Sequence, residues 1–222
     1  MTAAIITPQH STKPTTGVGA TPIVALKRRT IDSVLIGFGV VAVLVFGVAG
    51  GLLTWGNQFS SDYVSRELGS QNVSFPSAED LTAGGRADLL QWAGHKVDTG
   101  DEAQAYASFI NGHLAKIAGG KTYADLGAIE SAAKADVTTA TTAGKPQATL
   151  DQLRATASGI TAQRDSLFRG ETLRGLLLSA YAWSTVGTIA GIAALGAFVA
   201  AAVMAVLVGL GLMHQRRTTK SG

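Results

Sequence analysis

The sequence predicts an all-α fold: two transmembrane helices forming a helical hairpin, with an extracytoplasmic small helical bundle between them. Two apolar segments without charged residues, 34–55 and 186–213, count 22 and 28 residues, and a membrane-spanning helix needs about 20. The residues between them carry helical periodicity and almost no strand pattern. The predicted parts are a tail at 1–30, a span at 34–55, an outer domain at 57–182, a span at 186–213 and a tail at 214–222.

The segment before the first span mixes Thr, Pro, Gly and Ala without helical or strand periodicity. This composition predicts a disordered, basic cytoplasmic tail over residues 1–30. A cleaved signal peptide is the alternative interpretation of the first span, but 33 residues precede it and its apolar stretch exceeds the ~7–15 residues of a signal core. We therefore expect an uncleaved membrane anchor.

Basic residues flank both spans on the sides that lead to the chain ends. They are Lys27, Arg28, Arg29, Arg216, Arg217 and Lys220. The segment between the spans has 11 Lys and Arg against 14 Asp and Glu, and the chain has no cysteine for disulfides. Because basic flanks stay on the cytoplasmic side, we expect a multi-pass membrane protein with both termini cytoplasmic and the central domain outside.

The clearest outer helix begins near Asp101 or Glu102 and ends at Gly119 and Gly120. One continuous face of this helix is apolar or aromatic, and it predicts either an internal core or a surface for a partner. The residues of this possible interaction face are Tyr106, Phe109, Ile110 and His113.

Two more outer segments have helical spacing, one from Tyr123 to about Ala140 and one from Ala148 onward. In the second, the apolar residues share one face and Arg164 is predicted to lie largely off it. Trp55 and Trp183 flank the two spans, and we expect both at the outer membrane interface, where aromatic rings are enriched.

The densest polar cluster is His95, Asp98, Asp101 and Glu102, in a predicted turn before the Tyr106 helix. Acidic residues at a helix start are favourable without a ligand, and no HExxH motif or calcium-loop spacing is present. His95, Asp98 and Asp101 are therefore only weak metal candidates. The chain also lacks a Gly-x-Ser-x-Gly elbow, a Walker loop and a Cys-x-x-Cys-His motif, so we predict no catalytic residues, no cofactor and no enzyme.

Small residues in the spans predict close helix contacts. Gly47 and Gly51 form one Gly-x-x-x-Gly pair, and Gly187 and Gly191 form another. Such pairs let helices approach closely in lipid, either between the two spans or with another subunit. We expect membrane lipid and a protein partner or a second copy as partners, and no nucleic acid, because the net positive charge of the chain comes from its two tails.

Residues 91–107, 109–114 and 119–126 resemble a family of actinobacterial two-span membrane proteins, many of which are labelled aromatic ring-opening dioxygenases. The first stretch reads Gln-Trp-Ala-Gly-His-Lys-Val-Asp-Thr-Gly-Asp-Glu-Ala-Gln-Ala-Tyr-Ala. The resemblance implies an actinobacterial plasma membrane and an outer domain between two spans. Those dioxygenases hold iron with histidines and carboxylates, whereas the matching positions here offer His95 and His113 in no such frame, so the resemblance implies no site.

We predict a non-catalytic accessory or scaffold subunit of a cell-envelope membrane complex, because the conspicuous features are packing surfaces. The alternative is an extracytoplasmic ligand sensor, which would signal through a partner because only nine residues follow Met213. A metal-dependent envelope enzyme around His95 is a third, weaker hypothesis.

Overall fold

The computed structural model describes residues 28–220, and all regular elements in this part of the chain are helices, which confirms the all-α part of the predicted fold class. The elements are α1 (Arg28–Ser70), α2 (Ala78–Ala83), the 3-10 helix η1 (Ala87–Trp92), α3 (Gly100–Ala118), α4 (Tyr123–Thr142) and α5 (Gln147–Lys220). The described part contains no β-strand, only an isolated antiparallel bridge between Ser74 and Lys96.

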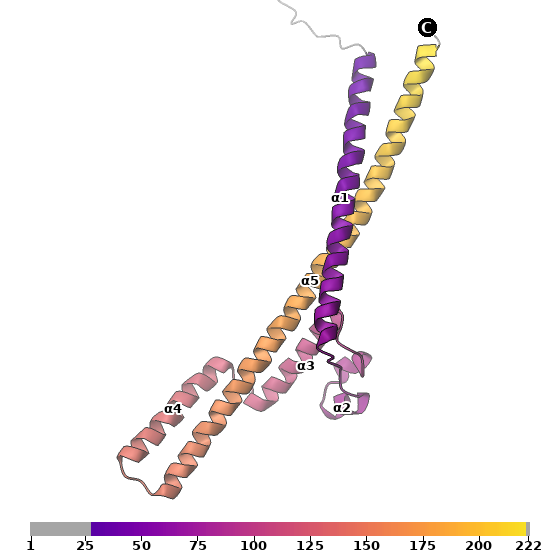
Figure 1. Cartoon of the computed structure of the whole chain (residues 1–222). Coiled ribbons are helices and arrows are strands. Elements are labelled where there is room, and N and C mark those ends of the chain that lie inside the picture. The colour runs from indigo at the N-terminus through magenta and orange to yellow at the C-terminus, as the bar shows by residue number, and fades with distance from the viewer. Residues whose placement is uncertain (1–27, 221–222) are drawn as a thin grey trace, which may run out of the picture.

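Two helices dominate the molecule, α1 with 43 residues and α5 with 74. At 1.5 Å per residue they are about 65 and 111 Å long. They run antiparallel and side by side, so both described chain ends lie at the same end (Figure 1). Both are long and apolar enough to cross a membrane. The first apolar segment lies within one helix that continues to Ser70, and α5 joins the predicted outer domain to the second apolar segment without a break.

The pairing of α1 with α5 keeps one register along the hairpin. A Cβ added to Gly39 would clash with Val208, and one added to Gly187 would lie 2.9 Å from Cβ of Ser60. In each such pair the residue number on α1 and the residue number on α5 add up to 247 or 248, so the register between the two helices is constant. Residues 34–55 of α1 therefore lie level with residues 192–213 of α5, and the second predicted span starts about six residues farther out.

The same register corrects the prediction for the two tryptophans. Trp183 lies level with Val64, where its carbonyl accepts a 2.5 Å hydrogen bond from Ser60 Oγ. Trp55 is about nine residues, or about 14 Å, closer to the inner end. Both side chains are exposed, at 65% for Trp55 and 52% for Trp183. The prediction that they share one level is wrong, because the sequence gives no register between two helices.

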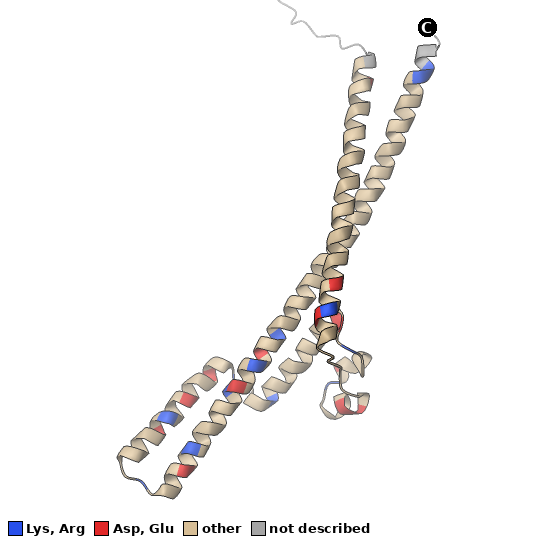
Figure 2. Ribbon diagram, viewed as in Figure 1, with Lys and Arg blue, Asp and Glu red and all other residues tan. Residues whose placement is uncertain are grey.

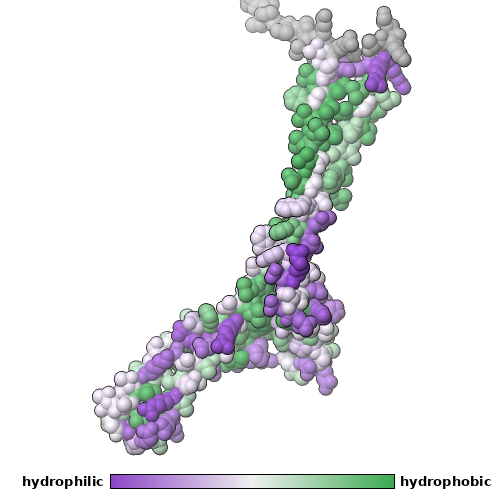
Figure 3. Space-filling model, in the orientation of Figure 1, coloured by the Kyte–Doolittle hydropathy of each residue, from purple (hydrophilic) through white to green (hydrophobic). Residues whose placement is uncertain are grey.

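Below the basic residues near the C-terminal end of α5, the upper part of the hairpin shows no charge (Figure 2), and the same zone is hydrophobic on the surface (Figure 3). In α1, 29 residues without charge separate Asp32 from Asp62. They span about 43 Å, close to the ~40–45 Å of a bilayer with its headgroups. The charge-free stretch of α5 is longer, from Gly175 to Gln215, and extends beyond the level of Asp62.

The outer part is an arm built on α5, which packs in succession against α4, α3 and α1 (Figure 1). Every tenth residue of α5 is buried over this course, namely Ala157, Leu167, Leu177 and Gly187. Ten residues fall about 80° short of three full turns. The buried side of α5 therefore turns steadily, and its partners wrap around it.

Local sequence sets the ends of α3 and α4. Thr99 and Thr122 are the N-caps, each with a complete capping box, to Glu102 and Asp125 respectively. Gly119 ends α3 in the left-handed conformation, with φ 58°. The predicted bounds of both helices are confirmed to within two residues.

Two clusters of buried apolar side chains hold the arm together. The first joins the α2 and η1 region and α3 to α5 through Phe75, Leu81, Leu89, Val97, Ala103, Ala107 and Leu177. The second lies where α3, α4 and α5 meet, and consists of Leu114, Ala118, Leu126 and Leu167. The core is thus distributed along α5.

Candidate functional site

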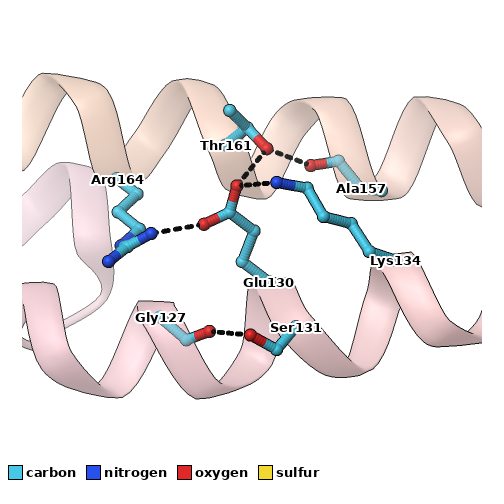
Figure 4. A network of polar contacts seen from close by, with 7 residues as sticks. All are labelled: Gly127, Glu130, Ser131, Lys134, Ala157, Thr161 and Arg164. Atoms are coloured by element: carbon cyan, nitrogen blue, oxygen red, sulfur yellow. Dashed lines mark hydrogen bonds and ion pairs between the residues drawn. The ribbon is translucent and has the colours of Figure 1, made fainter.

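The densest polar network of the arm joins α4 to α5 around Glu130, whose side chain is only 7% exposed (Figure 4). Lys134 Nζ donates to Glu130 Oε1 at 2.6 Å, and Thr161 Oγ1 donates to the same oxygen at 2.7 Å. Arg164 Nη1 donates to Oε2 at 2.7 Å. The network therefore supplies donors to both oxygens of a carboxylate that water scarcely reaches.

Arg164 lies between two helices and touches aromatic and glycine surfaces as well. Its guanidinium carbon stands 4.2 Å from the centre of the Tyr123 ring, a cation–π distance. A Cβ on Gly127 would lie 3.4 Å from the guanidinium, so the glycine makes room for it. The Arg164 Nε atom is buried without a hydrogen-bond partner.

The electrostatics of this network favour a fixed charge. Hydrogen bonds from Lys134, Thr161 and Arg164 lower the pKa of Glu130 from 4.5 to about 2, against the opposing effect of burial. A general base works best with a pKa near the operating pH. Glu130 is therefore poorly suited to proton transfer at neutral pH, and the network acts as a clasp between α4 and α5.

Sequence reasoning missed this clasp and misplaced Arg164, which was predicted to lie largely off the apolar face of its helix. The arginine follows Ala157 and Ile160 by seven and four residues, and this spacing puts all three on one face. Glu130 and Lys134 also stand at the i,i+4 spacing of an ion pair. These two spacings together were the available signal.

The predicted polar cluster before α3 is a helix cap. Glu102 Oε2 accepts hydrogen bonds from the backbone N–H groups of Asp98 and Thr99, at 3.1 and 3.0 Å, and from Thr99 Oγ1 at 2.8 Å. Burial opposes ionisation of Glu102, yet these hydrogen bonds lower its pKa. The cluster fixes the start of α3.

The weak metal candidates do not converge. Among the described residues, no group of three or more His, Asp or Glu side chains could hold a metal ion. His95 Nδ1 lies 3.7 Å from Glu102 Oε1, whereas Asp98 contributes its backbone N–H to the cap. His95, Asp98 and Asp101 therefore form no ligand set.

The predicted interaction face of α3 is largely used inside the arm. Tyr106, Phe109 and Ile110 pack against the first apolar cluster. Tyr106 meets Phe75 edge to face, with ring centres 5.2 Å apart. His113 is exposed and lines a hollow between the α2 region and α3.

The predicted helix-packing glycines divide into two pairs. Gly187 and Gly191 lie against α1, where a Cβ on Gly191 would come 3.1 Å from the Asn57 side chain. A Cβ on Gly47 or Gly51 would meet nothing within 4 Å. The predicted contact of Gly47 and Gly51 with α5 is therefore wrong. A contact of these two glycines with another subunit stays a prediction.

Sequence reasoning also missed close contacts between the spans. A Cβ on Gly50 would lie 2.8 Å from the Phe198 ring, and Gly39 approaches Val208 closely. Neither Gly39 nor Gly50 has another glycine four residues away, so the Gly-x-x-x-Gly pattern could not identify these two contacts.

A hollow of about 190 Å³ lies between the α2 region and α3, and its lining includes His113, Lys116 and Arg86. Its cations already bind the protein: Lys116 Nζ donates to Gly84 O at 2.6 Å, and Arg86 Nη1 donates to Ser108 O at 2.7 Å. These contacts tie the α2 region to α3 and form no pair of groups poised for acid–base chemistry.

Comparison with family models, with curated proteins and with solved structures finds no match for this chain. The resemblance to the actinobacterial two-span family therefore stays a prediction.

Proposed function

We propose that the chain is a non-catalytic integral membrane protein that serves as an accessory or scaffold subunit of a complex in a bacterial cell envelope. The observation that carries this proposal is the continuity of α5, one helix of 74 residues shared by the outer arm and the apolar span. A protein partner bound to such an arm would be held at a fixed place relative to the membrane.

The polar groups of the arm support a scaffold role. Glu130 and Glu102 are held ionised by the clasp and by the helix cap, with lowered pKa values. Their hydrogen bonds fix helices to one another or set a helix start. The arm thus uses its buried charges for its own rigidity.

We further propose that both termini lie in the cytoplasm and the arm lies outside the plasma membrane. Support comes from the equal depth of the inner ends of both spans, the basic residues that flank them and the charge-free length of α1.

Cysteine labelling tests this topology cleanly, because the natural chain has no cysteine. We expect Gln152→Cys, on the exposed surface of the arm, to react with a membrane-impermeant maleimide in intact bacterial cells. Ser11→Cys, in the N-terminal tail, should react only after the membrane is permeabilised. The reverse pattern, or labelling of both in intact cells, would contradict the proposed orientation.

Purification from native membranes tests the scaffold role. A C-terminally tagged chain is extracted in mild detergent, and the co-eluting proteins are identified by mass spectrometry. We expect a stoichiometric membrane protein partner, and we expect it to be lost when the α4–α5 hairpin, residues 123–163, is replaced by a short linker. A chain that elutes alone would overturn the proposal.

The continuity of α5 also favours a second candidate, an extracytoplasmic sensor that signals through a partner. A lone chain that retains a small molecule from the envelope would favour this candidate. Bound metal that disappears in the His95→Ala variant would instead favour the enzyme hypothesis.

A further inference from the structure

A groove of about 440 Å³ lies between α1 and α5 at the inner end of the hairpin. Its wall is formed by large apolar side chains, namely Leu35, Ile36, Met204, Leu207, Val208 and Leu210. Polar groups close one end of the groove, from Asp32 on α1 and from His214 and Gln215 on α5. The groove is therefore polar at one end and apolar along the rest of its length.

Two glycines create this shape. Gly39 and Gly211 both line the groove and bring the helices together, since Gly39 faces Val208 and a Cβ on Gly211 would lie 3.2 Å from Ile36. Because Val208 and Ile36 pack into the positions where these glycines lack a side chain, the two helices approach closely at the floor of the groove, and the larger residues beside them form its walls.

The depth of the groove decides what fills it. Its polar end lies at Asp32, where the charge-free length of α1 begins, and its apolar wall extends from there into the span. In this part of a bilayer the surroundings are hydrocarbon without water. An apolar hollow that opens there matches the chemistry of an acyl chain.

The polar end selects the headgroup. It places the carboxylate of Asp32 across from the imidazole and amide of α5, and the exposed Arg216 follows directly in sequence. A carboxylate accepts hydrogen bonds from an ammonium group, and an arginine pairs with a phosphate. Within the groove the Asp32 carboxylate supplies an acceptor, and the basic residues that flank both spans can pair with a phosphate, a combination that matches a zwitterionic headgroup with a primary amine.

We propose that this groove binds one phospholipid of the cytoplasmic leaflet, with an acyl chain along the Leu207 wall and the ammonium of an ethanolamine headgroup at Asp32. The inference rests on the proposed membrane placement. Cysteine labelling tests that placement without reference to any lipid, so the two ideas fail separately.

Native mass spectrometry of the purified full chain tests the lipid site. The chain is exposed in detergent to equal amounts of phosphatidylethanolamine, phosphatidylcholine and phosphatidylglycerol. We expect one retained phosphatidylethanolamine per chain, with a preference of about tenfold over phosphatidylcholine, whose quaternary amine has no N–H to donate. Equal retention of these two lipids, or preference for phosphatidylglycerol, would overturn the headgroup assignment.

Matched variants locate the lipid. Leu207→Trp fills the groove from its rim, whereas Leu195→Trp places the same side chain on an exposed position outside the groove. We expect lipid retention to fall at least about tenfold in the first variant and to stay unchanged in the second. Asp32→Asn should retain lipid but lose the preference for the primary amine. Equal retention in the two tryptophan variants would refute the groove as the site.

Discussion

At the scale of single residues, Glu130 shows how a buried charge organises the arm. A carboxylate removed from water is costly unless donors surround it. Here Lys134, Thr161 and Arg164 supply three hydrogen bonds, and Arg164 also stacks on Tyr123. Removing one member of such a set destabilises a protein more than replacing the whole set by apolar side chains does, because the remaining charges stay buried without partners.

Glu130→Gln removes the charge with little change in shape. We expect α4 to separate from α5 more often, because Lys134 and Arg164 lose their anionic partner. Hydrogen exchange of α4 amides should become faster and the melting temperature should fall. The control is Glu171→Gln, which breaks an exposed pair with Arg174 and should change stability by less than about 0.5 kcal/mol. Equal exchange in both variants would contradict the clasp.

The lowered pKa of Glu130 predicts a pH dependence. A carboxyl that has a pKa of about 2 when folded and 4.5 as the ordinary value binds protons more readily in the unfolded chain, so its contribution to stability is complete above about pH 5 and is lost as the pH falls toward 2. Thermal unfolding of the natural chain and of Glu130→Gln should therefore differ at pH 7 and converge near pH 2. A constant difference across this range would be inconsistent with the clasp.

At the scale of helices, the capping boxes fix where the arm bends. Thr99→Ala removes the side chain that accepts the Glu102 N–H and donates to the Glu102 carboxylate. We expect a loss of about 1 kcal/mol in the free energy of unfolding. Thr142→Ala, at the last turn of α4, removes only a bond to its own helix at Thr138 and should stay within about 0.5 kcal/mol. Denaturant titration followed by circular dichroism measures both.

The α1–α5 contact gives a second prediction at this scale. A side chain at Gly187 would press on Ser60 and the backbone of Asn57, whereas one at Gly51 would meet open space. We expect Gly187→Leu to lower stability by about 1–3 kcal/mol, as overpacking does. Gly51→Leu should leave the monomer unaffected. Thermal unfolding in detergent compares the two, and equal melting temperatures would contradict the register described here.

At the scale of the whole molecule, α5 couples the arm to the span. Spin labels at Thr156 and Thr188 sit 32 residues apart on one helix, so we expect a single narrow distance near 48 Å. Double electron–electron resonance spectroscopy of the spin-labelled chain in nanodiscs measures this distance. A shorter or bimodal distance would show a bend and would weaken the scaffold proposal.

Much of this architecture could be predicted from sequence because the signals are local. The charge-free lengths give the apolar helices, and Thr99 and Gly119 mark the ends of α3. The rest depends on which helices meet. Local spacing puts Arg164 on the apolar face of α5 and pairs Glu130 with Lys134, but it does not show that α4 and α5 bring Arg164 to Glu130. Nor does it show that Trp183 lies level with Val64, because both follow from the register between helices.

The close contact between α1 and α5 at Ser60 and Gly187 has a mechanical consequence. About 40 residues of α5 lie on the arm side of this tight contact, and about 26 lie between it and residue 213. Further close contacts at Phe198 and Val208 hold α5 to α1 beyond this point, so a tilt about the Gly187 contact moves the paired helices together as a lever whose two lengths are about 60 and 39 Å. A sideways displacement of about 3 Å at the tip of the arm would move the other end of the hairpin, near residue 213, by about 2 Å. Force applied to the tip of the arm would thus arrive at the other end of the hairpin, near residue 213, as a displacement about two thirds as large.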